Sequence, residues 1–463
     1  MTRRRGGPSG GARRRRLTPR RSPHDDVRAA AAWVVERTLD SLAPADSFLL
    51  GTEERFDPRD RALLRELVFG TLRWLRRLDD VIDRASHRRF EAIEPALRAP
   101  LRVAAYQLLF LDRVPPHAAV HEAVEQAGSL THRGGASFVN AVLRRIARDR
   151  SLAAWPVEDD DPVRRLAIEL SHPDFLVRRW LGRYGERRCR ALLEANNRPK
   201  PLHLLAFRDR GGRELLAERL IDAGVEVEPA PLSLLGLIVR RGDPFASEAF
   251  ARGDFYVQDE ASQAAALLPP PAAGERVLDA AAAPGGKTFA LLAWEPRIHP
   301  VVADADPGRL SVLRANLARL GRPVPTALAD AVRPPFRPAF DRVVLDLPCT
   351  GTGTLRKHPE LKWRIGEREI GRLSGQGATM LAGAASAVAP GGLLVAITCS
   401  LEPEENEEIV EGFLAGGGAG RFERLPLDDL PPPLDAGVAG PGAWQVLPSG
   451  DHDGFTVGVL RRR

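Results

Sequence analysis

Cysteine is scarce in this sequence, with three among 463 residues. So few thiols cannot make a disulfide framework, and no CxxC or HExxH pattern indicates a zinc site. We therefore expect no metal, and free thiols as in a reducing cytoplasm. No apolar run reaches about 18 residues, and no apolar segment follows the basic N-terminus. These absences argue against a membrane span and a secretory signal.

Positive charge is concentrated at the N-terminus. Residues 1–24 hold nine arginines and no acid, whereas the whole chain has a formal net charge of only +6. A segment rich in Gly, Pro and like charges cannot bury enough surface to fold, so we expect a disordered tail over 1–24. Two interpretations stay open: an arm that binds nucleic-acid phosphate, or a tail without a specific role, including one that follows from a misplaced start codon.

The rest of the chain divides by pattern into three regions. Residues 25–152 have apolar side chains at helical spacing and no strand-like alternation, which predicts an all-α helical bundle. Residues 153–255 begin with an acidic linker and continue with helices and a β-α-β element, which predicts a small α+β domain. Residues 256–463 alternate short apolar runs with amphipathic segments, which predicts a doubly wound, Rossmann-like α/β domain of seven strands.

Polar residues follow the predicted strands of the third region. Strands are expected at 276–280, 299–305, 324–330, 340–348 and 392–400, with a late, antiparallel strand at the C-terminus. The first is followed by a loop with Gly285 and Gly286, and the second and third end in Asp304 and Asp330. Such a loop with carboxylates at neighbouring strand ends favours an adenosine-containing ligand. Each aspartate alone has the plainer interpretation of a solvated cap.

Two of the cysteines lie at equivalent positions. The fourth predicted strand ends in Asp346-Leu347-Pro348-Cys349 and the fifth in Thr398-Cys399-Ser400. Neighbouring strands lie roughly 5 Å apart, so we expect both thiols at one edge of the sheet, beside the glycine loop. The third, Cys189, lies in a helical pattern and is expected to be a small buried hydrophobe.

These motifs resemble those of RNA cytosine-C5 methyltransferases. The similar segments are DAAAAPGGKT, VQDEAS, DLPCTGTGTLRKHPELKWR, TCSLEPEEN and the closing DGF. The helical first half resembles the NusB-like domain of the RsmB (Fmu/Sun) subgroup, which modifies 16S ribosomal RNA with S-adenosylmethionine. The resemblance covers about residues 25–463 and implies a cytoplasmic RNA methyltransferase.

The resemblance implies roles for individual residues. Cys399 would be the nucleophile, Cys349 the cysteine that assists product release, and Asp346 a catalytic residue that faces the reacting centre. The S-adenosyl-L-methionine site would comprise Ala281, Ala282, Ala283, Pro284, Gly285, Gly286, Lys287, Asp304, Asp330 and Asp346. The sequence departs from the family at Ala281, Leu347, Thr350 and Ala396; Leu347 and Ala396 are expected to compensate each other in volume.

A thiolate must attack, so the nucleophile needs activation at neutral pH. We expect help from the N-terminus of a helix after Glu402, or from Lys287. The segment LRKHPELKWR combines basic residues with Trp363, a composition that suits single-stranded RNA. The expected RNA contacts are Arg356, Lys357, His358 and Arg364, against the alternative of a solvated loop with Trp363 in the core.

Three functions remain open from the sequence. The first is methylation of C5 of a cytosine in 16S rRNA by a monomer. The second is the same chemistry on tRNA or another RNA. The third is a non-catalytic NusB-like RNA-binding or assembly factor with a vestigial methyltransferase domain, against which the retention of both cysteines argues.

Overall fold

The computed structural model describes residues 26–131, 133–154, 157, 159–427, 430, 432–436, 438–440 and 443–463. The chain divides into two compact units, an N-terminal unit of residues 1–154 and a C-terminal unit of residues 155–463. The predicted tail over 1–24 lies outside the described residues. None of the helices in the described ranges is both long and apolar enough to cross a bilayer.

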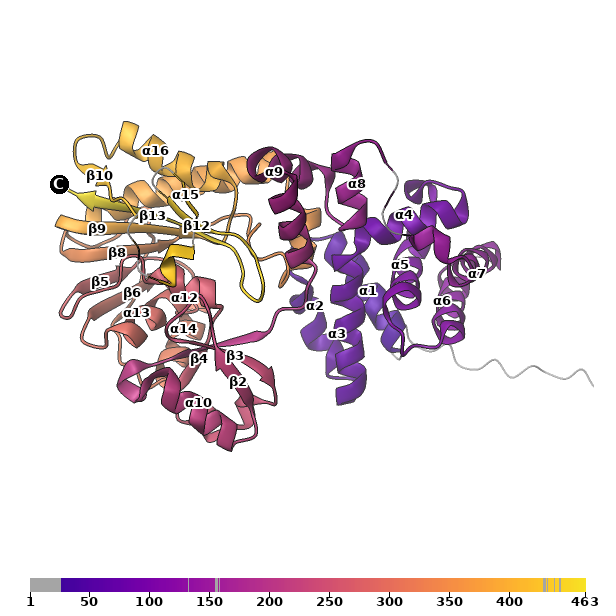
Figure 1. Cartoon of the computed structure of the whole chain (residues 1–463), viewed down its shortest axis with the longest axis horizontal. Helices are drawn as coiled ribbons and strands as arrows, with labels where there is room; N and C mark the ends of the chain where they lie inside the picture. The colour runs from indigo at the N-terminus through magenta and orange to yellow at the C-terminus, as the bar shows by residue number, and fades with distance from the viewer. Residues whose placement is uncertain are drawn as a thin grey trace, which may run out of the picture. The chain divides into compact units, whose positions relative to one another are not determined.

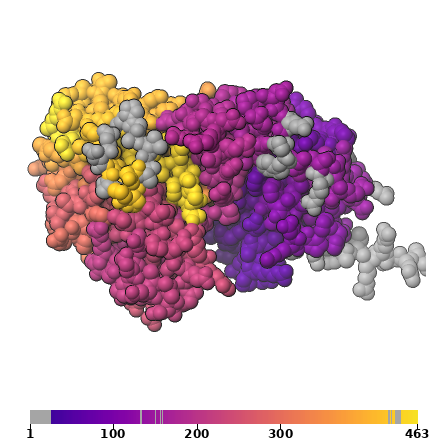
Figure 2. Space-filling model, viewed as in Figure 1, coloured from indigo at the N-terminus to yellow at the C-terminus, as the bar shows by residue number. Residues whose placement is uncertain are grey.

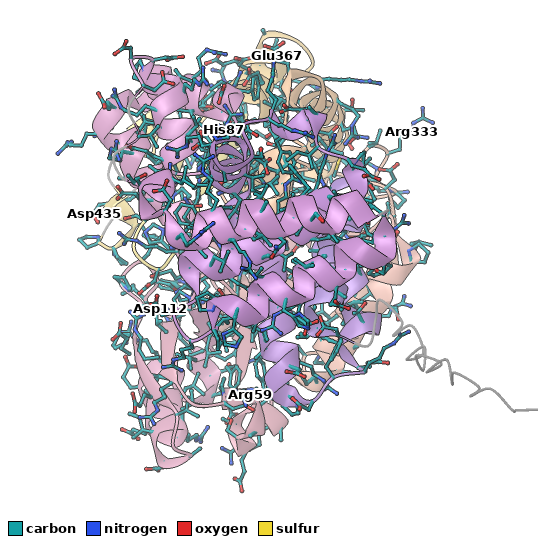
Figure 3. All side chains as sticks on the ribbon, turned by 90° about the vertical axis from the view of Figure 1, so that its right-hand side faces the viewer. Arg59, His87, Asp112, Arg333, Glu367 and Asp435 are labelled. Atoms are coloured by element: carbon teal, nitrogen blue, oxygen red, sulfur yellow. The ribbon has the colours of Figure 1, made fainter. Side chains whose placement is uncertain are left out.

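The N-terminal unit is a helical bundle, as the sequence predicts (Figure 1). The central helix α1 starts where the Asp26 carboxylate accepts hydrogen bonds from two first-turn amides, and it packs against α2, α3, α5 and α6. Helix α4 ends at His87, labelled in Figure 3, in a left-handed conformation with φ of 56°. The elements are α1 (Val27–Leu39), α2 (Ala45–Glu53), α3 (Pro58–Arg73), α4 (Leu75–Ser86), η1 (Phe90–Ala92), α5 (Pro95–Phe110), α6 (Pro116–Leu130), α7 (Arg133–Arg148) and η2 (Arg150–Ala153).

The C-terminal unit opens with two helices and a small domain with an antiparallel sheet. The sheet order is β2-β3-β1-β4, and every pairing is antiparallel. The predicted β-α-β element accounts for β1, α10 and β3, whereas β2 and β4 are additional. The elements are α8 (Pro162–Glu169), α9 (Asp174–Asn196), β1 (Leu202–Ala206), η3 (Arg208–Arg210), α10 (Gly212–Asp222), β2 (Glu226–Pro229), β3 (Gly236–Arg241), η4 (Pro244–Ala246), α11 (Glu248–Ala251) and β4 (Phe255–Val257).

The large sheet follows in the same unit. Its order is β11-β12-β13-β9-β8-β5-β6-β7, with β10 paired to β13. Strands β5 to β9 are parallel to one another, and β13 runs antiparallel to its neighbour β9. The elements are α12 (Glu260–Ala266), β5 (Arg276–Asp279), α13 (Gly286–Trp294), β6 (His299–Asp304), α14 (Pro307–Arg319), β7 (Thr326–Leu328), β8 (Phe340–Asp346), η5 (Pro359–Trp363), α15 (Glu367–Ala384), η6 (Ala385–Ala387), β9 (Val388–Thr398), η7 (Pro403–Glu405), α16 (Glu407–Ala415), β10 (Phe422–Arg424), η8 (Leu434–Ala436), β11 (Val438–Gly440), β12 (Ala443–Val446) and β13 (Phe455–Arg462).

Helices cover both faces of the large sheet (Figure 1). Alternate residues of one strand enter different cores: Val344 packs with α12, α13 and α14, whereas Val343 and Leu345 pack with α15 and α16. A strand buried on both faces reads as a continuous apolar run, which is why the central parallel strands are evident in the sequence, whereas β7 at the end of the parallel part is partly exposed. The doubly wound fold is confirmed, but the sheet has nine strands among the described residues rather than seven.

Strand order reverses between β5 and β8. The chain proceeds from β5 through β6 to β7 on one side, then returns to β8 and β9 on the other. In a doubly wound sheet, loops at the carboxyl ends diverge at this point and leave a crevice where ligands bind. The glycine loop after β5 and Asp346 at the end of β8 therefore lie on its two sides.

Candidate active site

The two cysteines after β8 and β9 come together. The strands are paired in parallel with Asp346 opposite Ile397, and the Leu347 amide donates to the Ile397 carbonyl over 2.8 Å. Cys349 and Cys399 follow these pairs, and their Sγ atoms lie 3.5 Å apart. The predicted convergence of two thiols separated by fifty residues is confirmed.

The surroundings of Cys349 keep its thiol protonated. Its hydrogen bond with Cys399, burial, and the negative charges of Glu405 and Asp346 raise the pKa of Cys349 well above its ordinary value. A protonated Cys349 can donate its hydrogen to the Cys399 sulfur. The pair therefore favours one sulfur as proton donor and the other as nucleophile.

The predicted helix after Glu402 begins later than expected. Residues Pro403–Glu405 form a single 3₁₀ turn, and α16 starts at Glu407.

The third cysteine, Cys189, packs as a small hydrophobe in the core around α8 and α9, as predicted. Burial raises the pKa of its thiol to about 11. Cys189 is thus separate from the pair at the strand ends.

Lys287 connects the glycine loop to the cysteine strands. Its Nζ lies 3.1 Å from Asp346 Oδ2 and 3.1 Å from Ser262 Oγ. The same Nζ lies 5.0 Å from the centre of the Phe455 ring, a distance typical of a cation–π contact. A cation from the loop after β5 is therefore held against the carboxylate at the end of β8, at the edge that carries Cys349.

The predicted cofactor residues lie along the ends of β5, β6 and β7. Gly285 has φ of 116°, a conformation that favours glycine, and α13 begins at the next residue. Asp304 is buried and accepts hydrogen bonds from the Ala283 amide over 3.1 Å and the Asp306 amide over 3.0 Å. Asp330 is exposed and accepts from the Val332 amide over 2.9 Å. Carboxylates in this arrangement suit ribose hydroxyls and an exocyclic amine.

The structure corrects the expectation for Arg356. Its side chain is 2% exposed, and its guanidinium donates to the carbonyls of Ala195, Gly450 and His452 over 2.9–3.2 Å. A guanidinium bound this way stabilises the fold and is not available to RNA. The neighbouring Lys357 is exposed.

The other basic residues of this segment are less exposed than Lys357. His358 and Arg364 are half-buried, and His358 Nδ1 lies 3.7 Å from Glu360 Oε1. Lys362 is buried and donates to Asn197 Oδ1 over 2.7 Å. Trp363 is also half-buried. Among these candidates, Lys357 is the side chain best placed to meet RNA.

Sequence reasoning missed three residues within the quoted motifs. VQDEAS provides Ser262, the partner of Lys287, and DGF provides Phe455 beside the same lysine. TCSLEPEEN provides Glu405, which accepts hydrogen bonds from Thr350, the residue after Cys349. Their appearance in the resemblance was the only sequence signal. Within the described ranges, no three His, Cys, Asp or Glu side chains are placed to hold a metal ion.

Leu347 and Ala396, where the sequence departs from the family, enter the same core on the α15 face of the sheet. They also line one small cavity together with Thr398 and Glu405. This placement is consistent with the expected exchange of volume between the two positions.

Comparisons with known proteins identify the family of this chain. The family described as 16S rRNA methyltransferase RsmB/F matches residues 265–461, NusB matches 28–148, and an RsmF/B-like ferredoxin-like domain matches 172–245. The Pseudomonas syringae pv. tomato protein named ribosomal RNA small subunit methyltransferase B is 36% identical over 94% of this chain and 96% of its own. This chain belongs to the RsmB/F methyltransferase family.

Another curated relative and two solved structures are similar to much of this chain. The Pasteurella multocida protein of the same name is 33% identical over 94% of this chain and 96% of its own. Among solved structures, PH0851 has a TM-score of 0.75 and 27% identity, with 94% of this chain and 98% of that chain covered. A methyltransferase homologue from Pyrococcus horikoshii has a TM-score of 0.55 and 27% identity over 66% of this chain and all of its own. The similarity therefore extends through both units.

Proposed function

We propose that this protein methylates C5 of a cytosine in RNA with S-adenosylmethionine as methyl donor, and that its substrate is 16S rRNA. The observation that carries the proposal is the 3.5 Å distance between the Sγ atoms of Cys349 and Cys399, beside the Lys287–Asp346 pair. The relatives named ribosomal RNA small subunit methyltransferase B, similar along nearly the whole chain, support the choice of RNA.

The chemistry explains the need for a sulfur nucleophile. C5 of cytosine is a weak nucleophile, and covalent catalysis divides its reaction into easier steps. The Cys399 thiolate adds to C6, the C5=C6 pair of electrons moves to form a C4=C5 bond, and the C4=N3 pair moves to N3, which takes up a proton. C5 thereby gains enamine character. After C5 is alkylated, a base removes the C5 proton, the C5=C6 bond re-forms and the Cys399 thiolate leaves.

Cys349 is proposed to serve the second half of this sequence. Its thiol, protonated in the resting pair, faces the Cys399 sulfur. Once it has lost that proton, the Cys349 thiolate would take the C5 proton and so allow Cys399 to leave. Asp346 is half-exposed and hydrogen-bonded to Lys287, so the pair is placed to orient the ring and to supply a proton to N3 as negative charge develops there.

The residues at the strand ends fit the proposed methyl donor. When bound, S-adenosylmethionine supplies the electrophilic methyl group. The loop Ala281–Lys287 would follow its methionine portion, and Asp304 would hold the ribose hydroxyls. Asp330, exposed at the end of β7, would meet the adenine amino group. These assignments follow from donor and acceptor chemistry along the crevice.

The test compares three cysteine variants with RNA and methyl donor. Cys399→Ala should abolish methylation. Cys349→Ala should accumulate an RNA–protein adduct visible on a denaturing gel. Cys189→Ala, a matched control in the α8/α9 core, should methylate at close to the wild-type rate.

Bisulfite sequencing of rRNA and tRNA, with and without the gene, identifies the substrate. Methylation by Cys399→Ala at the wild-type rate would reject the nucleophile. A modified cytosine in tRNA alone would reject 16S rRNA as the substrate.

A further inference from the structure

The acidic segment Glu402–Glu405 after Cys399 directs its side chains either to α9 or to the cysteine loops. Glu402 and Glu404 both bind Arg179 of α9, at 2.6 Å each. Glu405 has no accessible surface and is directed to the other side, where the cysteines lie. A run of acids in the sequence suggests a solvated face, but a carboxylate this deeply buried requires polar partners.

Glu405 binds the residue next to Cys349 at two points. Its Oε1 accepts from the Thr350 amide over 2.8 Å, and its Oε2 accepts from the Thr350 hydroxyl over 2.7 Å. Burial raises the pKa of Glu405, and its hydrogen bonds with Ser400 and Thr350 oppose that shift. Ser400 directly follows Cys399, so one carboxylate contacts the residue after each cysteine.

Asn406 fixes the other loop. Its Nδ2 donates to the carbonyls of Ser400 over 3.1 Å and Glu402 over 2.8 Å, and its Oδ1 accepts from the Thr398 hydroxyl. Thr398 and Ser400 flank Cys399 on both sides. Both hydrogens of the amide nitrogen and its oxygen are therefore used to shape the backbone that carries Cys399.

The two loops are also joined directly. The Gly353 amide donates to the Cys399 carbonyl over 2.8 Å, and the Leu401 amide donates to Thr352 Oγ1 over 2.8 Å. The cysteine loops thus form one hydrogen-bonded unit, with Glu405 and Asn406 behind it. A change in either side chain acts on a loop whose other contacts remain.

We propose that Glu405 and Asn406 are positioning residues: Glu405 holds the Cys349 loop at two points through Thr350, besides its one hydrogen bond with Ser400, and Asn406 holds the Cys399 loop at three points. This division of roles rests on the proposed function, in which Cys399 attacks and Cys349 assists release. Loss of Glu405 displaces Cys349 and slows release, so covalent adduct accumulates. Loss of Asn406 displaces Cys399 and slows attack, so adduct becomes scarce.

Glu405 also acts through its charge. Its carboxylate is one of the negative groups that raise the pKa of Cys349. Glu405→Gln removes that charge and also replaces one of the two acceptor oxygens with an amide donor, so the Cys349 loop is held less firmly and the Cys349 thiolate forms at lower pH than in the wild type. The pH dependence of adduct release therefore shifts toward lower pH, which a merely structural role would not cause.

The experiment measures RNA adduct on denaturing gels for Glu405→Gln, Thr350→Val and Asn406→Ala, each also combined with Cys349→Ala. A displacement of about 1 Å changes rates by up to about 100-fold, so Glu405→Gln should raise steady-state adduct about tenfold or more. Thr350→Val removes one of two bonds and should give a smaller rise. Asn406→Ala should reduce the adduct trapped by Cys349→Ala.

Glu404→Gln is the matched control, since it removes a neighbouring acid that faces Arg179, and it should leave the adduct at the wild-type level. Thermal unfolding shows which variants fold. Folded Thr350→Val and Glu405→Gln proteins with wild-type adduct and an unshifted pH profile would overturn the proposal. If Cys349→Ala alone yields no adduct, the assigned cysteine roles fail instead.

Discussion

Lys200 is a half-buried cation between two carboxylates. Its Nζ lies 2.9 Å from Asp259 Oδ2 and also contacts Asp453. The two carboxylates are almost fully buried, and His203 Nδ1 lies 3.4 Å from the same Asp259 oxygen. Burial alone would raise the pKa of Asp259, but the Lys200 charge and the His203 hydrogen bond outweigh it and lower that pKa. This cluster joins the small domain to the VQDEAS and DGF segments.

Lys200→Met should strongly destabilise the C-terminal unit. At 2.9 Å, one ion pair is worth about 6 kcal/mol at an effective dielectric of 20, before desolvation is subtracted. Removal of one partner of a buried pair typically costs about 3–5 kcal/mol, because it leaves a buried charge without its counter-ion. We expect a loss in that range at pH 7. Methylation should also fall, because Phe455 in the DGF segment lies beside Lys287.

The pH dependence gives the prediction its sign. A carboxyl whose pKa is lower in the folded state contributes stability above its unfolded value of about 3.9 and loses it as pH falls toward the folded value. Asp259 in the wild type is such a group. In Lys200→Met the carboxylates gain protons more readily. The difference in free energy of unfolding between the wild type and Lys200→Met should therefore narrow as pH falls from 7 toward 4.

Urea unfolding followed by tryptophan fluorescence at pH 7 and pH 5 measures both effects. Lys200→Arg retains the charge and should lose less stability. Lys357→Gln, which removes an exposed lysine, should behave like the wild type. A Lys200→Met protein within about 1 kcal/mol of the wild type at pH 7 would refute the reasoning.

Further predictions concern the cysteine loops, the cofactor and RNA. Arg356→Gln should reduce the free energy of unfolding in urea by about 2–4 kcal/mol. Lys357→Gln should instead lower RNA affinity and reduce the slope of log affinity against log salt concentration by about 1. Equal stability of the two variants would contradict the structural role of Arg356. Gly353→Ala should abolish activity, because its Cβ would lie 2.2 Å from the Gly454 carbonyl oxygen. Asp304→Ala should weaken S-adenosylmethionine binding about tenfold or more in calorimetry, and unchanged affinity would remove it from the site.

The fold was largely predictable where burial is local in the sequence. The runs at β5 and β9 are apolar because both faces of the strand are covered. Strand β2, with the sequence EVEP, is largely exposed and has no such pattern. Its strand character comes from pairing with β3, a tertiary contact that the segment itself does not encode. In Figure 2 the C-terminal residues, in yellow, reach the surface above the small domain, in pink. An ion pair between Arg240 of β3 and Asp451 joins these two segments.

The site was predictable at the strand ends and less so between them. Cys349 and Cys399 follow strands, so topology alone brings them together. Arg356 was misassigned because carbonyl and phosphate oxygens are both good acceptors for a guanidinium, and the sequence does not say which one is nearby. Glu405 was missed because its burial depends on the loop after β8, more than fifty residues away in the chain.

The central claim is that Cys399 attacks C6 of an RNA cytosine and that Cys349, which lies next to Cys399, assists its release. An RNA that carries 5-fluorocytosine tests it directly, because fluorine at C5 cannot leave as a proton does and the adduct is trapped. After nuclease and protease digestion, mass spectrometry identifies the modified peptide. The account predicts a nucleotide on Cys399 in the wild type and in Cys349→Ala. A nucleotide on Cys349, or no covalent adduct with methyl donor present, would contradict it.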